Sequence, residues 1–159
     1  MTSLHPEQKP PILHAAILAK APLHVIQDIV NRFDYTLLKV DSLNRIPIEI
    51  AIDKCLGWSE GMQDIVEATT LVQQQRSSIY VAAKYGLRWS NGMKELAEEN
   101  VDEIMNGNDS STGLRLFMYA AMSSSRCDLS VIYGMMRMGP DQRIDFDECT
   151  NTRKRTRLE

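Results

Sequence analysis

Cysteines and long apolar stretches are scarce in this chain of 159 residues. The three cysteines, Cys55, Cys127 and Cys149, are odd in number and far apart, which argues against a disulfide framework and predicts reduced thiols. We therefore expect a cytoplasmic protein, with the nucleus as the other reducing compartment. No apolar run reaches the roughly 18 residues of a membrane-spanning helix. The opening MTSLHPEQKPP also lacks the charged-then-apolar order of a secretory signal, so we expect no membrane association.

Several catalytic motifs are missing too. The sequence contains no glycine–lysine phosphate loop, no G-x-G-x-x-G and no H-E-x-x-H. Its histidines, His5, His14 and His24, do not stand at the close spacing that zinc sites use. We therefore expect no catalysis and no metal or other cofactor. The alternative is a small helical enzyme or ligand-binding protein whose site is assembled from scattered residues.

Charge is distributed unevenly along the chain. The formal net charge is −3, although the last seven residues, RKRTRLE, carry four basic side chains and one acid. Residues 1–152 therefore carry −6, which is not the charge of a folded nucleic-acid-binding domain. The basic tail could be a solubilising end, a nuclear-import segment or a weak nucleic-acid contact. Four basic residues make few phosphate contacts, so nucleic acid is not the partner that we expect.

One phrase occurs twice. AIDKCLGWSEGMQDIVEA (51–68) and AAKYGLRWSNGMKELAEE (82–99) share alanine, leucine, tryptophan, serine, glycine and methionine at a spacing of 31 residues. Internal repeats with periods of about 20–50 residues indicate stacked structural units. Equivalent alanines extend the pattern to four units, at Ala16, Ala51, Ala82 and Ala120. Each of these alanines is small because a neighbouring helix is expected to approach it closely.

Each alanine is followed by the apolar stripe of an amphipathic helix, with positions i, i+3, i+4 and i+7 on one side. The four stripes are Ile26/Ile29/Val30/Phe33, Met62/Ile65/Val66/Thr69, Met93/Leu96/Ala97/Asn100 and Leu129/Ile132/Tyr133/Met136. Ser59, Ser90 and Asp128 are the expected N-caps of the last three helices. The sequence therefore predicts an all-α chain in which each unit is a turn, a short helix, a tight loop and a longer helix.

Trp58 and Trp89 come just before that loop, and Gly61 and Gly92 lie within it, where backbone freedom is needed. Two interpretations of the tryptophans remain open. They pack over the loop between helices, or they serve as exposed anchors for a partner.

The units resemble the ankyrin repeat, which has a period near 33, a turn and two helices, and a first helix that opens T-P-L-H-x-A. Pro47-Ile48-Glu49-Ile50-Ala51 matches its proline, its leucine-like position and its alanine, and Leu13-His14-Ala15-Ala16 keeps the histidine. The third and fourth units depart further, with Tyr80 and Met118 at the histidine position. The chain is thus similar to divergent ankyrin-repeat proteins, as about four degenerate units. The resemblance implies that His14 forms a hydrogen bond between units.

The resemblance also implies an architecture, an ankyrin-like helical-repeat solenoid of helix–loop–helix units joined by turns. Residues 1–9 are expected to form an N-terminal tail, residues 10–148 the repeat domain and residues 149–159 the basic C-terminal tail. The four units are expected at about 10–40, 41–74, 75–108 and 109–147.

The function that the resemblance implies is a non-catalytic protein–protein interaction module, a scaffold or adaptor that binds a partner protein through its concave face. We expect the protein to be mostly a monomer, and the sequence does not identify the partner. The first helices and the turn tips would line that face. Carried over by position, its residues are Asn44, Arg45, Ile50, Asp53, Lys54, Val81, Lys84, Tyr85, Arg115, Tyr119 and Met122.

Overall fold

The computed structural model describes residues 11–107, 113–123 and 128–138. Within these ranges the elements are helices, which confirms the all-α fold class. They are α1 (Ile12–Leu18), α2 (Leu23–Arg32), the 3-10 helix η1 (Asp34–Leu38), α3 (Pro47–Asp53), η2 (Trp58–Glu60), α4 (Met62–Val72), α5 (Ser78–Tyr85), η3 (Trp89–Asn91), α6 (Met93–Glu99), α7 (Val101–Asn106), α8 (Leu116–Ser123) and α9 (Leu129–Arg137). None of these helices has the length and apolar character needed to cross a bilayer. The tails at 1–9 and 149–159 lie outside the described residues.

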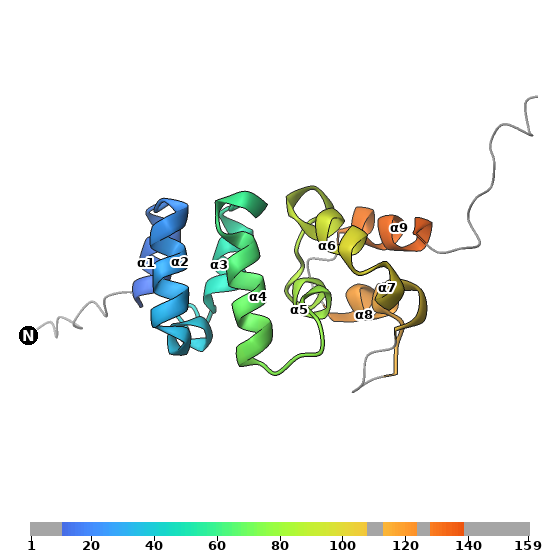
Figure 1. The fold of residues 1–159 in the computed structure, drawn as a ribbon, viewed down its shortest axis with the longest axis horizontal. Helices are drawn as coiled ribbons and strands as arrows, with labels where there is room; N and C mark the ends of the chain where they lie inside the picture. The colour runs from blue at the N-terminus through green and yellow to red at the C-terminus, as the bar shows by residue number, and fades with distance from the viewer. Residues whose placement is uncertain (1–10, 108–112, 124–127, 139–159) are drawn as a thin grey trace, which may run out of the picture.

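The helices pack in pairs along the long axis of the molecule (Figure 1). α1 packs against α2, α3 against α4, α5 against α6, and α8 against α9. At two junctions between neighbouring pairs, the first helix contacts the first helix of the next pair and the second contacts the second. These contacts are α1 with α3 and α2 with α4 at one junction, and α5 with α8 and α6 with α9 at the other. The middle junction differs because α4 contacts α5 there, and Figure 1 shows α5 almost end-on beside the upright α4.

Most of three of the four predicted stripes lies in the core. Ile26 and Ile29 of α2, Met62 and Ile65 of α4, and Leu96 of α6 are all buried, as their spacing predicts. Phe33, the last residue of the first stripe, is exposed, and Asn100, the last of the third, is half-buried. The fourth stripe is wrong, because Leu129, Tyr133 and Met136 are exposed while Val131 and Met135 of the same helix are buried. α9 is apolar on two sides, so its sequence is compatible with two stripes. The contacts with α6, α8 and η3 select one of them.

The first three short helices end in the same way, in the Schellman motif. A backbone amide five residues beyond the register alanine donates to the alanine carbonyl at 2.9 Å in each helix, from Ala21 to Ala16, from Leu56 to Ala51 and from Leu87 to Ala82. The residue before that amide has a positive φ, 50° at Lys20, 52° at Cys55 and 77° at Gly86. The alanines that align in sequence are therefore also equivalent in backbone geometry.

Of the three expected N-caps, two are wrong and one is confirmed. Ser59 and Ser90 are not N-caps, because they lie inside η2 and η3. α4 and α6 begin after Gly61 and Gly92, whose φ values of 118° and 113° turn the chain between the 3-10 helix and the α-helix. Asp128 does cap α9, where its carboxylate accepts a hydrogen bond from the amide of Ser130 at 3.0 Å.

Only the third of the Schellman positions carries glycine, which suggests a direct stability test. A side chain with a Cβ costs about 1 kcal/mol in the left-handed conformation. We expect Cys55→Gly to raise the free energy of unfolding by about that amount, and Gly86→Ala to lower it by a similar amount. Urea denaturation followed by circular dichroism measures both changes. Equal stability of all three proteins would contradict the assigned backbone geometry.

Candidate partner-binding face

Each short helix of the four pairs exposes the residue two positions after its register alanine. These residues are Leu18, Asp53, Lys84 and Met122, and we call them the first-helix row. Two residues correspond to about 200° around a helix, so this position points away from the buried alanine. Leu18 and Met122 are 45% and 75% exposed, although both are apolar. Leu18 was not among the predicted residues, although its place in the alanine register is the signal that could have identified it.

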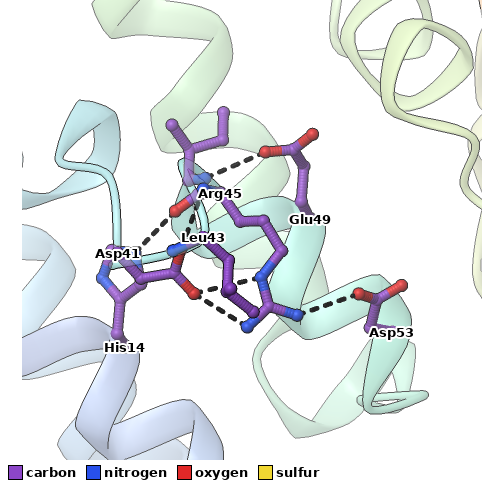
Figure 2. Close-up of polar contacts among 7 residues, drawn as sticks. His14, Asp41, Leu43, Arg45, Glu49 and Asp53 are labelled. Atoms are coloured by element: carbon purple, nitrogen blue, oxygen red, sulfur yellow. Dashed lines mark hydrogen bonds and ion pairs between the residues drawn. The ribbon is translucent and has the colours of Figure 1, made fainter. Parts of the chain in front are cut away.

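A network of polar contacts fixes the turn before α3 (Figure 2). One carboxylate oxygen of Asp41 accepts hydrogen bonds from the amides of Leu43 and Arg45, at 2.8 and 2.9 Å. Its other oxygen accepts from Nε and Nη2 of Arg45, at 3.0 and 2.8 Å. The same guanidinium reaches Asp53 in the first-helix row at 3.4 Å. Arg45 therefore connects the turn tip to the row and is not a free cation.

The Asp41 carboxylate has a shifted pKa. Desolvation raises the pKa of this group, but the hydrogen bonds from the amide and side chain of Arg45 and from the amide of Leu43 lower it more. The net result is a pKa of about 2 in place of 3.8. A carboxyl group whose pKa is depressed by folding stabilises the folded state above its unfolded pKa. That contribution is lost as the pH falls from about 3.8 towards 2.

The shift predicts a pH-dependent effect of Asp41→Asn. The amide can still accept from the backbone of the turn, but it loses the ion pair with Arg45. We expect the variant to melt a few degrees below the wild-type protein at pH 7, and the difference to shrink as the pH falls from 4 towards 2. Circular dichroism melts at several pH values measure it. The matched control is Asp28→Asn, because Asp28 pairs with Arg32 on the solvent-exposed side of α2 and should change little. A difference from wild type that is constant with pH would contradict the assignment.

His14 ties the first pair to this turn. It is fully buried, and its Nε2 donates to the carbonyl oxygen of Arg45 at 3.0 Å. The two residues belong to the first and second units, so the predicted hydrogen bond between units is confirmed.

Four of the other predicted residues lie on exposed or half-buried surface. Asn44 is at the turn tip with a φ of 59°, and Lys54 and Arg115 are exposed. Tyr85 is half-buried. Its hydroxyl accepts a hydrogen bond from Gln73 at 2.7 Å, and Nζ of Lys84 lies 5.2 Å from its ring centre.

The remaining three predicted residues contribute to packing. The Tyr119 ring packs edge-on against Tyr80, with centres 5.7 Å apart. Ile50 and Val81 have no exposed surface at all. Both precede a register alanine and sit on the side of the helix that is covered in the stack. They are core residues, and their assignment to the binding face is therefore corrected.

Each tryptophan packs against a glycine of the following pair, Trp58 over the loop before α6 and Trp89 against the middle of α9. A Cβ placed on Gly92 would overlap the indole ring of Trp58, and a Cβ placed on Gly134 would overlap that of Trp89. Ile26 lies in the same way against Gly61, at 3.1 Å from such a Cβ. Both tryptophans are half-buried against the core, so the interpretation as packing residues is confirmed.

These contacts predict a large effect of adding one methyl group. We expect Gly92→Ala to lower the free energy of unfolding by about 3 kcal/mol, because it adds backbone strain to a steric clash. Gly113→Ala is the matched control, since Gly113 also has a positive φ but nothing lies within 4 Å of a Cβ there. It should cost about 1 kcal/mol. In a Trp58→Ala background the Gly92→Ala effect should fall to that of the control. An unchanged effect would contradict the proposed contact.

A cavity of about 330 Å³ lies at the loop tips of the first two pairs. Lys20, Lys54, Cys55, Ser59 and Glu60 line it above an apolar floor. Gly57–Gly61 has the letters G-x-S-x-G, which the nucleophile turn of α/β-hydrolases uses between a strand and a helix. Here Ser59 lies between two helices, in η2, with no strand before it. The letters alone therefore do not indicate a nucleophile.

Within the described residues, no three histidine, cysteine, aspartate or glutamate side chains gather as a potential metal site. Comparison with known proteins finds no match, whether with a family model, a curated protein or a solved structure.

Proposed function

We propose that this chain is an ankyrin-like solenoid that binds a partner protein along its first-helix face, without catalysis. The observation that carries the proposal is the first-helix row. Four equivalent positions are exposed, on α1, α3, α5 and α8, and two of them hold large apolar side chains. A repeated exposed position on rigid helices is what a preformed binding surface requires, because little ordering is needed on binding.

The composition of this surface supports a protein partner. The row and its neighbours include methionine and tyrosine, which are enriched in protein interfaces, beside leucine and a few charges. The second helices of the two middle pairs differ. They are not both the longer ones, since α6 has seven residues and α5 has eight, contrary to the predicted order of a short and a longer helix. α4, α6 and the α7 that follows α6 carry seven acidic side chains against the single Lys94, which is typical of a solvated outer face. A partner is therefore expected on the side of the short helices.

The proposal is tested with a triple variant of the row, Asp53→Ala/Lys84→Ala/Met122→Ala. The protein, immobilised, is exposed to an extract of the cells that produce it, and retained proteins are identified by mass spectrometry. We expect a specific partner that the wild-type protein retains and the row variant loses. Tyr85 and Tyr119 are left intact because neither belongs to the first-helix row.

The matched control is Glu67→Ala/Lys94→Ala/Leu71→Ala, which removes one acid, one base and one apolar side chain from exposed positions of α4 and α6. Circular dichroism establishes that both variants fold. Loss of the partner by the control and not by the row variant would place binding on α4 and α6 and refute the proposal.

A second candidate function, the binding of a small anionic molecule, is favoured only by the cavity that Lys20 and Lys54 border. Its apolar floor and two ammonium groups suit a ligand with an apolar body and an acidic end. The Glu60 carboxylate in the same lining accepts a hydrogen bond from the amide of Gly57 at 2.9 Å. If no protein is retained in the capture experiment, this cavity becomes the leading site.

A further inference from the structure

Charge is divided between the two halves of each unit. We divide every unit after its first helix, so that the described parts of the first halves are 11–21, 41–56, 75–87 and 113–123. These segments carry six basic and three acidic side chains, a net charge of +3. The described second halves carry five basic and eleven acidic side chains, a net charge of −6, over residues 22–40, 57–74, 88–107 and 128–138. The first helices and their turns are therefore basic in a chain whose net charge is −3.

All three acidic side chains of these first halves are held by partners within the chain. Asp41 and Asp53 both contact the guanidinium of Arg45, at 2.8 and 3.4 Å (Figure 2). The Glu49 carboxylate accepts a hydrogen bond from the amide of Ile46 at 2.9 Å. These carboxylates are therefore already used in fixing the turn before α3.

Most of the basic side chains of the first halves are not paired in this way. Arg45 is bound by the two aspartates, and Arg76 lies 3.9 Å from Glu103 of α7. The other four are exposed and form no ion pair with an acid of the described residues. They are Lys20, Lys54, Lys84 and Arg115. Lys20 and Lys54 line the same cavity, so they lie close together at the ends of neighbouring first helices.

The acids of the second halves act only weakly at this surface. Most of them are exposed, and the exposed side of a second helix is separated from the outer side of the first by the thickness of the pair, about 20 Å. Charges farther apart than about 8 Å are largely screened at physiological ionic strength. A partner at the first helices is therefore influenced mainly by the cations beside it.

Apolar side chains accompany these cations. Met118 and Met122 stand four residues apart on α8, so they share one side of the helix, and they are 45% and 75% exposed. Leu18 of α1 is exposed as well, and methionine adapts its shape to varied apolar partners. Separated cations beside apolar side chains suit a peptide. Nucleic acid would need more phosphate contacts than four cations supply.

We propose that the first-helix face binds an acidic segment of its partner protein, in which glutamate or aspartate accompanies large apolar side chains. The carboxylates pair with Lys54 and Lys84, and the apolar side chains contact Leu18 or Met122. The inference rests on the proposed function, because it names the chemistry of the partner that binds there. Neighbouring helices pack about 10 Å apart and an extended chain advances about 3.3 Å per residue, so a segment of about 10 residues spans the four pairs.

Selection from a random peptide library displayed on phage provides the test, with the immobilised full chain as the target and peptides of about 10 residues. We expect the selected peptides to be rich in glutamate and aspartate beside large apolar residues. A selected peptide is then synthesised with a fluorescent label, and its binding is measured by fluorescence anisotropy. Lys54→Glu/Lys84→Glu should weaken that binding at least about tenfold, because attraction becomes repulsion at two contacts. Added salt should weaken the binding to the wild-type protein.

The matched control is Arg32→Glu/Lys94→Glu, which makes the same change in net charge at exposed cations of α2 and α6. It should bind the peptide within about twofold of the wild-type protein. Circular dichroism establishes that each variant folds. Lys54→Gln/Lys84→Gln places no acid at the ends of α3 and α5, so it tests the same contacts if the reversed variant does not fold. It should weaken binding in the same direction by a smaller factor.

The outcomes separate this inference from the proposed function. Selected peptides that are not enriched in acids, but that the row variant no longer binds, would overturn the acidic segment and leave the proposed function standing. Peptides that the row variant binds as well as the wild-type protein does would refute both. A library that yields no binding peptide would overturn the acidic segment, whereas the capture experiment would still decide the proposed function. A single-stranded oligonucleotide that binds as tightly as the peptide, and that Lys54→Glu/Lys84→Glu no longer binds, would assign these cations to nucleic acid and overturn the inference.

Discussion

The close approach of a large side chain to a glycine of the next helix pair organises this protein. Ile26 lies against Gly61, Trp58 against Gly92 and Trp89 against Gly134, so each junction between pairs contains one such contact. Because a single Cβ would overlap the two indole rings, the glycines fix how near one pair can come to the next. The contact with Trp89 also explains why Gly134 stands in the middle of α9, because a glycine at such a position lowers helix stability.

The buried alanines of the first helices are a second constraint on the same stack. Ala51 and Ala82 are fully buried, and their carbonyls accept the hydrogen bonds that end α3 and α5. The position two residues later is then directed outwards by helical geometry. The exposed first-helix row is thus a consequence of the buried alanines, and the polar network around Arg45 holds one member of the row, Asp53, in place.

The middle of the stack departs from its two ends. The second and third pairs meet through α4 and α5, whereas the outer junctions join like helices. Trp58 nevertheless reaches Gly92 across this junction. The loop of the second pair therefore still contacts the loop of the third pair, although the first helices of these pairs, α3 and α5, do not stack as they do at the outer junctions. A surface that follows the first helices changes direction at this point. A partner that contacts Asp53 and Lys84 together would have to follow that bend.

The sequence by itself determined the helical class and most of three buried stripes, because both depend on periodicity. Of the expected N-caps it determined only Asp128, and the His14 contact followed from the resemblance to the ankyrin repeat. It could not decide which of two apolar sides α9 buries, since its pattern fits both. It also placed Ile50 and Val81 on the binding face, because the position before an alanine can point to a groove or to a neighbouring pair. Only the tertiary structure decided these cases, since burial depends on which helices are adjacent.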